Sequence, residues 1–453
     1  MIYLCLAHMS EDGMEQKYVK EAFDTNWVVP MGPNVTAFEQ SLENFVKSTD
    51  NGQQSTAPDA KVVCLSAGTA AVHLALIACG VQAGDEVLVQ SFTFCASSHP
   101  ITYLGAKPVF VGSERETWNM DPELLEQAIL DRKEKTGRYP KAIIPVALYG
   151  MPYDCERIMA IADKYGIPVI EDAAEGMGSR FNGQVLGTFG RFGVLSFNGN
   201  KMITTSGGGA LICQDTKDAN DVMWYATQAR DAYPYYEHTA IGYNYRMSNV
   251  CAGIGRGQMT VLDDHIAHHK HVQELYRELL KDVKGVKLHE QPADPSIDSG
   301  QVPRYDSNFW LCAATLDEDV RIVGQENAYK EIIKSAVGGA AGVIKQVESA
   351  TTDCQPNDNV EALRVFMLNK KVECRPLWKP MHKQPVYTTV ECGELRVESL
   401  PNGIIRQTSD KCVTYTKGVE EDLFKVGFCL PAGPYVTDED VKYIVECIKE
   451  AMG

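Results

Sequence analysis

The sequence predicts an α/β fold, with a mainly parallel, doubly wound sheet in a large first domain and a smaller C-terminal α+β domain. Three observations lead to this prediction. Between residues 61 and 213, short β-branched runs alternate with helix-like segments, which is typical of strands joined by helical crossovers. Beyond Ser248, the alternation of strands and helices gives way to a long stretch in which apolar residues recur at helical spacing. The length of 453 residues exceeds what one core usually fills, so two domains are expected.

The strands of the first domain are expected where apolar runs are densest. These runs cover residues 62–65, 86–90, 108–111, 142–148, 167–172 and 194–197, and helices are expected from Gly68 and over residues 156–165. In such sheets, ligands bind outside the carboxyl ends of the strands. The residues that directly follow these runs are therefore the first candidates for a functional site.

The second domain is expected to begin with a long helical stretch. Ile254, Leu262, Leu275 and Leu279 recur beyond Ser248 at roughly helical spacing. We therefore predict a large domain over residues 1–250 and a connecting helix with a smaller domain over residues 251–453.

Charge and cysteine usage disfavour several classes of protein. The formal net charge of −17 argues against a nucleic-acid partner, because such proteins neutralise phosphates with clustered Lys and Arg. The 14 cysteines are dispersed and none forms a Cys-x-x-Cys pair, which indicates free thiols in a reducing compartment. We expect neither a signal peptide nor a membrane span. These observations predict a cytoplasmic protein without a nucleic-acid or membrane partner.

A phosphate-binding turn is expected at residues 66–69. Ser66, Ala67, Gly68 and Thr69 follow a strand and open a helix. Backbone N–H groups and the Thr69 hydroxyl can therefore hold a phosphate at the positive end of that helix. Small residues at such a turn can equally serve close packing, so this motif alone is weak.

An acid and a lysine follow two further strands. Asp172 ends the run over residues 167–172, and Lys201 follows Ser196 just before a glycine-rich segment that lets backbone approach a ligand. Alone, Asp172 can be a helix cap and Lys201 a surface residue. Together with the turn at Gly68, they form the set that pyridoxal 5'-phosphate (PLP) requires.

The chemistry of PLP accounts for each residue type. Lys201 would form a Schiff base with the cofactor aldehyde. Asp172 would keep the pyridine nitrogen protonated, so that the ring withdraws electrons. Phe94, which follows another strand, can stack on the ring or be a buried core aromatic. The sequence therefore predicts a PLP enzyme that moves an amino group to or from a small molecule.

Long motifs in order along the chain resemble the DegT-type nucleotide-sugar aminotransferases, which are fold type I PLP enzymes. They begin with His8-Met9 and Thr25-Asn26-Trp27, and continue with SAGTAAVHLAL, EDAAEGMGS, SFNGNKMITTSGGG, YNYRMSN, RPLWKPMH and CLPAG. The resemblance covers nearly the whole chain and is strongest to members from exopolysaccharide and bacillosamine-type pathways. It implies an enzyme that moves an amino group from glutamate to a 4-keto-6-deoxy nucleotide sugar, releasing 2-oxoglutarate, for polysaccharide or glycan precursors.

The resemblance also implies roles for individual residues. In the cofactor site, they are Gly68, Thr69 and Ser196 at the phosphate, Phe94 on the ring, Asp172 at the pyridine nitrogen and Lys201 as the Schiff-base residue. Glu175 stands where the family often has Gln, and its acidic form is similar to that of enzymes that aminate the sugar C4. It is expected near the cofactor and the substrate, with a part in catalysis.

Further implied residues concern the partner subunit and the substrate. Asn244 and Arg246 resemble a segment that a neighbouring subunit inserts into the cofactor site, which implies a homodimer with shared active sites. Arg375 and His382 fall in a motif associated with the substrate mouth. The stretches over residues 320–369 and 388–411 are longer than the family pattern, which leaves the contacts of the smaller domain to the nucleotide open.

Two other patterns are expected to be structural. His265 and His269 have the i, i+4 spacing of a metal pair, but no acidic or Cys ligand is fixed nearby, so we predict a solvated helix face and no metal site. Gly253, Gly255 and Gly257 imitate part of a dinucleotide fingerprint without a preceding strand. They are expected to serve close helix packing.

Two competing functions can be weighed from the sequence. A PLP-dependent sugar dehydratase of the same fold would carry histidine in place of Lys201, so Lys201 counts against it. A PLP-binding or sugar-binding regulatory protein without turnover would not need the complete set of Lys201, Asp172 and Ser196. Release of 2-oxoglutarate with a keto-sugar acceptor would separate that possibility from an aminotransferase.

Overall fold

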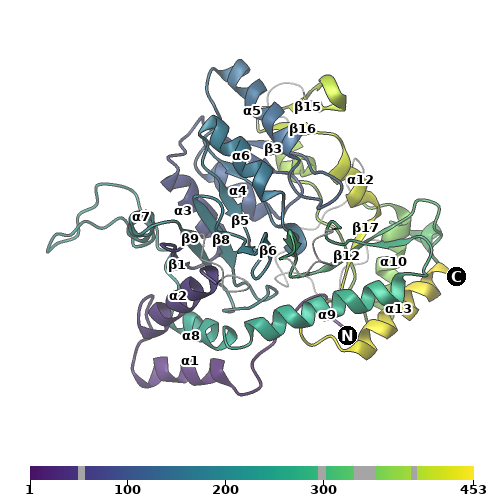
Figure 1. Ribbon diagram of the computed structural model, residues 1–453, viewed down its shortest axis with the longest axis horizontal. Helices are drawn as coiled ribbons and strands as arrows, with labels where there is room; N and C mark the ends of the chain where they lie inside the picture. The colour runs from purple at the N-terminus through teal and green to yellow at the C-terminus, as the bar shows by residue number, and fades with distance from the viewer. Residues whose placement is uncertain (49–56, 294–301, 331–353, 389–394) are drawn as a thin grey trace.

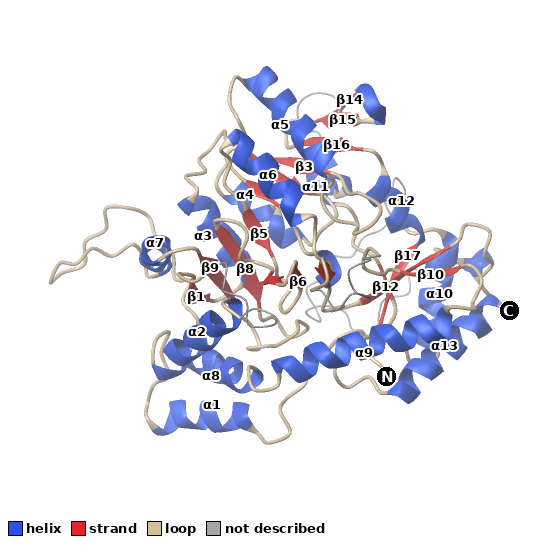
Figure 2. Ribbon diagram, viewed as in Figure 1, coloured by secondary structure: helices blue, strands red, loops and turns tan. Residues whose placement is uncertain are grey.

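A central sheet with helices on both faces forms the largest part of the molecule (Figures 1 and 2). The computed structural model describes residues 1–48, 57–293, 302–330, 354–388 and 395–453. Two ladders compose the sheet, in the orders β1-β9-β8-β5 and β14-β15-β16-β3-β2-β4. Parallel bridges from Ile143 to Val169 and from Val146 to Asp172 join them.

The strands of this sheet are mainly parallel, which confirms the predicted fold class. Parallel pairs are β2 with β3, β2 with β4, β5 with β8, and β3 with β16. Two strands run the other way: β9 is antiparallel to β1 and β8, and β15 is antiparallel to β14 and β16. The bounds of the strands of this sheet are β1 (Lys61–Leu65), β2 (Glu86–Gln90), β3 (Lys107–Val111), β4 (Ile143–Ile144), β5 (Ile170–Asp172), β8 (Phe192–Ser196), β9 (Gly209–Cys213), β14 (Arg396–Ser399), β15 (Ile405–Thr408) and β16 (Val413–Thr416).

Two hydrophobic clusters cover the two faces of the sheet, because successive side chains of a strand point to opposite sides. Val62 and Cys64 belong to one cluster, and Val63 and Leu65 to the other. The helices that connect these strands are α3 (Gly68–Ala78), α4 (His99–Tyr103), α5 (Pro122–Thr136) and α6 (Cys155–Tyr165), and α7 (Thr216–Ala226) follows β9. Burial on both faces explains why the strands read as continuous apolar runs.

Side-chain caps fix where several of these helices begin. The carboxylates of Asp121, Asp154 and Asp215 accept hydrogen bonds from backbone N–H groups in the first turns of α5, α6 and α7. Gly137 and Gly166 end α5 and α6 in the left-handed conformation that favours glycine.

The glycines at 253, 255 and 257 serve close helix packing, as predicted. They lie on α8 (Asn249–Gln258), which packs against α1 (Met14–Asp24) and α2 (Pro33–Val46). A Cβ at Gly253 would lie 2.8 Å from Asn34 Nδ2, and one at Gly257 would lie 2.5 Å from the backbone nitrogen of Glu15. Both positions therefore require the absence of a side chain.

A second, smaller sheet lies at the far end of α9 (Leu262–Leu280), the long helix in Figure 1. Its strand order is β10-β12-β17-β13, and a third cluster of buried apolar residues packs it against helices. The elements of this part are β10 (Val286–Leu288), β12 (Cys312–Leu316), β13 (Arg375–Pro376), β17 (Gly427–Leu430), α10 (Asp358–Asn369), α12 (Val419–Val426) and α13 (Asp438–Met452). A short ladder joins β6 (Arg180–Phe181), β7 (Gln184–Val185) and β11 (Tyr305–Asp306).

The division into domains at residue 250 stays a prediction, and two segments cross it. Strands β14 to β16 come from the second part of the chain but extend the large sheet beyond β3. Conversely, Ile2 forms a bridge with Val372, and the backbone N–H of Leu4 donates to a Glu373 carboxylate oxygen at 3.0 Å. Of the two stretches that exceed the family pattern, residues 331–353 and 389–394 lie outside the described residues.

Candidate active site

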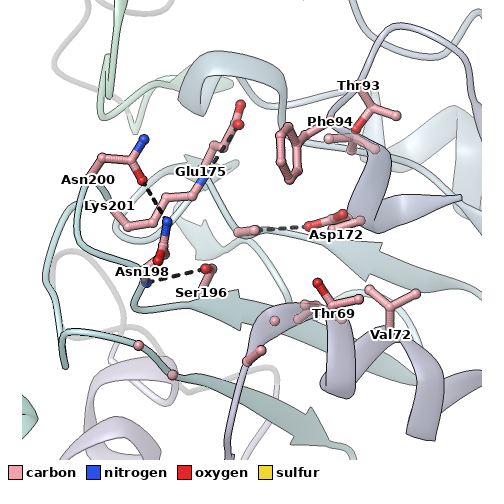
Figure 3. A pocket seen from close by; sticks show the side chains of 18 of the residues that line it. Thr69, Val72, Thr93, Phe94, Asp172, Glu175, Ser196, Asn198, Asn200 and Lys201 are labelled. Atoms are coloured by element: carbon pink, nitrogen blue, oxygen red, sulfur yellow. Dashed lines mark hydrogen bonds and ion pairs between the residues drawn. The ribbon is translucent and has the colours of Figure 1, made fainter. Parts of the chain in front are cut away.

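A cavity of about 420 Å³ lies at the carboxyl ends of the strands, where the sequence predicts a site. Segments that follow β1, β2, β5 and β8 line it, together with two tryptophans from the second part of the chain. Its lining includes Gly68, Thr69, Phe94, Asp172, Glu175, Ser196 and Lys201. Figure 3 shows the side chains of Phe94, Asp172 and Lys201 pointing toward this common space.

The turn between β1 and α3 presents backbone and hydroxyl groups to the cavity. Ala67 is extended at the start of α3 and provides no side-chain cap, so the first N–H groups of the helix stay available for a ligand. A Cβ at Gly68 would lie 3.2 Å from the Ser196 Cβ, so the turn and the end of β8 lie close together. Thr69 and Ser196 hydroxyls at this point, with the helix dipole, suit a phosphate.

Asp172 is a buried carboxylate held by two donors. Its Oδ2 accepts from Ser97 Oγ at 2.6 Å, and its Oδ1 accepts from the backbone N–H of Ala174 at 3.1 Å. Burial raises the pKa of Asp172, while these hydrogen bonds and the positive charge of Lys201 act in the opposite direction. Such a carboxylate gains from a cationic partner in the cavity, because a positive charge would stabilise its ionised form.

Lys201 is held between a carboxylate and an aromatic ring. Its Nζ lies 3.2 Å from Glu175 Oε1 and 4.0 Å from the centroid of the Trp310 ring. The other oxygen of Glu175 accepts from the backbone N–H of Tyr149 at 2.8 Å. Trp310 Nε1 donates to the carbonyl of Asn200 at 2.7 Å, which braces the turn that carries Lys201.

Phe94 is not a core residue, because 55% of it is exposed. Its ring centroid lies 6.2 Å from that of Trp378, and both residues line the cavity. The sequence leaves open whether Phe94 stacks on a ligand or is a buried core aromatic. Its exposed position favours a ring that faces a ligand.

Four of the residues expected at the site do not line this cavity. Arg246 Nη1 pairs with Glu39 of its own chain at 2.8 Å, and Asn244 is exposed on the segment that leads to it. Arg375 pairs with Glu373 at 2.6 Å. The resemblance thus locates their motifs but not the directions of their side chains.

His382 corrects the prediction of a residue at the substrate mouth. Its side chain is fully buried, its Nδ1 lies 2.6 Å from Ser91 Oγ, and its Nε2 lies 3.1 Å from Glu421 Oε1. Within the described chain it therefore ties the segment before Phe94 to α12 and has no access to a ligand.

The histidines of α9 correct a second prediction, that of a solvated helix face. His265 and His269 are buried, and their Nδ1 atoms lie 3.1 Å from the Met202 carbonyl and 3.2 Å from the Phe309 carbonyl. Helical spacing alone does not reveal which face of α9 is covered. No group of three or more metal-binding side chains occurs among the described residues.

The sequence interpretation missed Trp310, Trp378 and Ser97. The tryptophans reach the cavity only through the packing of the second part of the chain on the first, which no local pattern encodes. Ser97 stands just beyond the run that ends at Gln90, so its position after a strand end was the one available signal.

The donor set of the cavity fits PLP. A single space of this size holds an amine at Lys201, a buried carboxylate at Asp172 and a turn with hydroxyls at Thr69 and Ser196. These are the groups needed for the aldehyde, the pyridine nitrogen and the phosphate of the cofactor. Gly68, next to Ser196, leaves room where a larger residue would crowd the turn.

Comparison with known proteins agrees with this chemistry. EpsN of Bacillus subtilis (strain 168), named as a pyridoxal phosphate-dependent aminotransferase, is 38% identical over 99% of this chain and 95% of its own. The GDP-perosamine synthase of Escherichia coli O157:H7 is 30% identical over 99% of both chains. A crystal structure of a DegT DnrJ EryC1 StrS aminotransferase from Brucella abortus superimposes with a TM-score of 0.75, covering 98% of this chain and 96% of that one at 23% identity, and so shares the fold. Since residues 9–337 also match the family itself, the chain belongs to the DegT/DnrJ/EryC1/StrS aminotransferase family and is a PLP-dependent enzyme.

Proposed function

We propose that the enzyme transfers an amino group from glutamate to the C4 ketone of a 4-keto-6-deoxy nucleotide sugar, releasing 2-oxoglutarate. The observation that carries the proposal is the pairing of Lys201 with an acidic Glu175 in the cavity that also holds Asp172. Relatives from Escherichia coli, Vibrio cholerae and Caulobacter vibrioides are named GDP-perosamine synthases, which supports a nucleotide-linked sugar. The product would serve polysaccharide or glycan precursor synthesis.

PLP, when bound, supplies an electrophilic carbon and a ring that withdraws electrons from the carbon to be deprotonated. Gly68, Thr69 and Ser196 would bind its phosphate. Asp172 would hold a proton on the pyridine nitrogen, because its own carboxylate is buried and needs a cationic partner. Phe94 would cover one face of the ring.

Lys201 would first hold the cofactor covalently and then act as the base. Its Nζ, once free, would be the base that takes the proton from the α-carbon of glutamate. In the second half-reaction the same amine would move a proton to the sugar carbon that receives the nitrogen. Glu175 and Trp310 would keep that amine oriented, since both already contact it.

We also propose a homodimer in which each site is completed by the partner. The segment between α7 and α8 extends away from the body of the molecule in Figure 1, and Tyr236 and Ile241 on it are 77% and 85% exposed. Apolar side chains on such an arm gain free energy when a second subunit covers them. Asn244 and Arg246 follow this arm and bridge to Thr227 and Leu65 at its base. Their place beside the partner's site is therefore proposed from the family resemblance, with the exposed arm as the surface that the partner would cover.

The same proposal includes a cytoplasmic location. Within the described residues, the cysteines are free thiols, as a reducing compartment requires, and no helix there is long and apolar enough to cross a bilayer.

Separate measurement of the two half-reactions tests the proposed function. Glutamate should convert the enzyme to its amino form in the absence of sugar, and release one 2-oxoglutarate for each site. That form should then be screened against 4-keto nucleotide sugars with UDP, GDP and dTDP, together with a 3-keto sugar and a keto sugar without nucleotide. Reaction with the 3-keto or nucleotide-free sugar alone would contradict the proposal.

A further inference from the structure

One buried side chain, that of Asn308, is hydrogen-bonded to both residues that hold Lys201. Its Nδ2 donates to the backbone carbonyl of Glu175 at 2.9 Å, and its Oδ1 accepts from the backbone N–H of Trp310 at 2.8 Å. The Glu175 carboxylate and the Trp310 ring both contact the Lys201 amine. Because Asn308 is fully buried, it can affect that amine only through its neighbours.

The side-chain amide of Asn308 has one favourable orientation. Its Nδ2 also donates to the Met177 carbonyl at 2.8 Å, so both of its N–H groups are used. A flipped amide would direct its oxygen at the two carbonyls and an N–H at the N–H of Trp310, which would leave buried polar groups without partners. The backbone N–H of Asn308 donates to Ser179 Oγ at 2.9 Å and fixes the residue further.

The turn at Gly150 packs directly against this amide. Gly150 has a φ of +91°, and a Cβ there would lie only 1.8 Å from Asn308 Oδ1, so a residue with a side chain does not fit. The preceding residue, Tyr149, donates its backbone N–H to Glu175 Oε2 at 2.8 Å. Asn308 thus holds the backbone of Glu175 and also supports the turn that binds its carboxylate.

We propose that Asn308 is a positioning residue, which keeps the Glu175 carboxylate and the Trp310 ring at fixed places around Lys201. Glu175 follows β5 and Trp310 precedes β12, so without a common partner the two could shift independently. Displacement of a reacting group by about 1 Å can lower a rate by about 10²-fold. This inference rests on the proposed function, because it requires Lys201 to be the base.

Replacing the amide tests the proposal through rate and affinity together. Asn308→Ala removes the hydrogen bonds to Glu175 and Trp310, so the glutamate half-reaction, followed by stopped-flow absorbance, should slow by about 10–100-fold. The Kd of PLP and the KM of glutamate should stay within about twofold of wild type, since Asn308 contacts neither ligand. Asn308→Ser, whose hydroxyl can retain one hydrogen bond, is the second variant and should give an intermediate rate.

Labelling of Lys201 gives a readout that does not depend on turnover. In the cofactor-free protein, limiting acetic anhydride should acetylate Lys201 about threefold faster or more in Asn308→Ala than in wild type, because a less restrained amine reaches the reagent more often. Peptide mapping by mass spectrometry measures the difference, with the exposed Lys217 as the internal reference.

Asn359 offers a matched control. It is also a buried asparagine whose amide holds two backbone groups, since Nδ2 donates to the Val320 carbonyl at 2.6 Å and Oδ1 accepts from the Ile322 N–H at 3.3 Å. These contacts do not involve the residues around Lys201. Asn359→Ala should therefore lower the stability of the protein while leaving the glutamate rate and the labelling of Lys201 unchanged.

A mutant cycle separates positioning from a general effect on folding. In protein that already carries Glu175→Ala and Trp310→Leu, the groups through which Asn308 acts are absent. Asn308→Ala should then slow the glutamate half-reaction by less than about twofold further, because residues that act through one another are not additive. A slowing as large as in the wild-type background would mean that Asn308 acts by another route, and would overturn the inference.

The remaining outcomes separate this inference from the function on which it rests. An unchanged glutamate rate in Asn308→Ala, or a slower rate with unchanged labelling of Lys201, overturns the positioning role while leaving the aminotransferase intact. A loss of PLP affinity as large as the loss of rate does the same, because Asn308 would then support the whole site. If borohydride attaches the cofactor to another lysine, Lys201 is not the base, and that part of the proposed function fails together with the inference.

Discussion

The hydroxyl of Ser97 is the donor that most directly controls Asp172. Thr93 Oγ1 lies 2.8 Å from Ser97 Oγ, which in turn donates to the carboxylate at 2.6 Å. In Ser97→Ala this donor is lost, so the pKa of Asp172, already raised by burial, should rise further. The ionised form needed at the cofactor nitrogen then persists only at higher pH. We expect the acid limb of the kcat/KM profile for glutamate to move upward by about one pH unit.

Ser97→Thr keeps a hydroxyl at this position and should restore the wild-type profile. An acid limb that stays in place in Ser97→Ala would show that the hydrogen bond does not tune Asp172.

Removing the charge of Asp172 should affect the chemistry more than cofactor binding. In Asp172→Asn the pyridine nitrogen loses its anionic partner, while the phosphate turn at Gly68 and Thr69 is unchanged. The glutamate half-reaction, followed by stopped-flow absorbance, should slow by about 10²–10³-fold with PLP still bound. A rate near that of wild type would remove Asp172 from the mechanism.

Glu175→Gln should be milder than Asp172→Asn. Gln keeps the size of Glu175 and an oxygen that can accept from the Tyr149 N–H, but it loses the charge that pairs with Lys201. Borohydride reduction should still attach the cofactor to Lys201, as peptide mapping would detect. A loss as severe as that in Lys201→Ala would mean that Glu175 itself carries a proton in catalysis.

Site residues that follow strand ends could be predicted from the sequence, whereas site residues that reach the cavity through tertiary packing could not. Asp172 and Lys201 follow apolar runs, so their place at the cavity results from the geometry of a parallel sheet. Trp310 follows no strand of that sheet, and its contact with Lys201 depends on how the second part of the chain packs. His382 shows the opposite case, because its motif was recognised although its side chain is buried against Ser91.

Among the helices, α9 directly contacts the turn that carries Lys201. His265 holds the carbonyl of Met202, next to Lys201, and His269 holds the carbonyl of Phe309, next to Trp310. His269→Leu should leave the Phe309 carbonyl without its donor and lower the free energy of unfolding by about 1–3 kcal/mol. His269→Asn, whose amide can donate from a similar position, should recover part of this loss in denaturant titrations.

The same histidine should make stability sensitive to acid. Burial lowers the pKa of His269 to about 3, against about 6.5 in an unfolded chain. Folding therefore favours the neutral ring, and its full contribution is present above about pH 6.5 and is lost as the pH falls toward 3. The drop in Tm between pH 7.5 and 5.5 should be smaller in His269→Asn than in wild type. An equal drop would assign the acid sensitivity to other groups, such as the buried His289.

At the scale of the whole molecule, a shared active site predicts complementation between inactive variants. Asn244 is the suitable probe next to the arm, because Arg246 also holds Glu39 within its own chain. When Lys201→Ala and Asn244→Ala proteins are mixed and exchange subunits, each hybrid dimer should contain one intact site. Activity should recover to roughly a quarter of wild type. No recovery after verified exchange would place both residues in the same subunit's site.

The alternation of strands and helices over residues 61–213 was sufficient to predict the parallel sheet, since each crossover is local. The same pattern could not reveal that β16 pairs with β3, because Val413 and Val109 are far apart in sequence and only the folded register brings them together. For the same reason, neither the amino-acid composition nor the spacing of apolar residues could predict the bridge between Ile2 and Val372.

The pairing of β3 with β16 also constrains when the protein can fold during its synthesis. As the chain leaves the ribosome, residues up to Cys213 can form the inner strands, but the edge of β3 stays open until Val413–Thr416 emerge. Similarly, Ile2 cannot form its bridge until Val372 has been synthesised. An open edge of apolar strands is prone to pair with other chains. A chain whose translation stops before residue 396 would therefore keep its inner strands and expose this edge, which makes nascent or truncated forms the ones most dependent on chaperones.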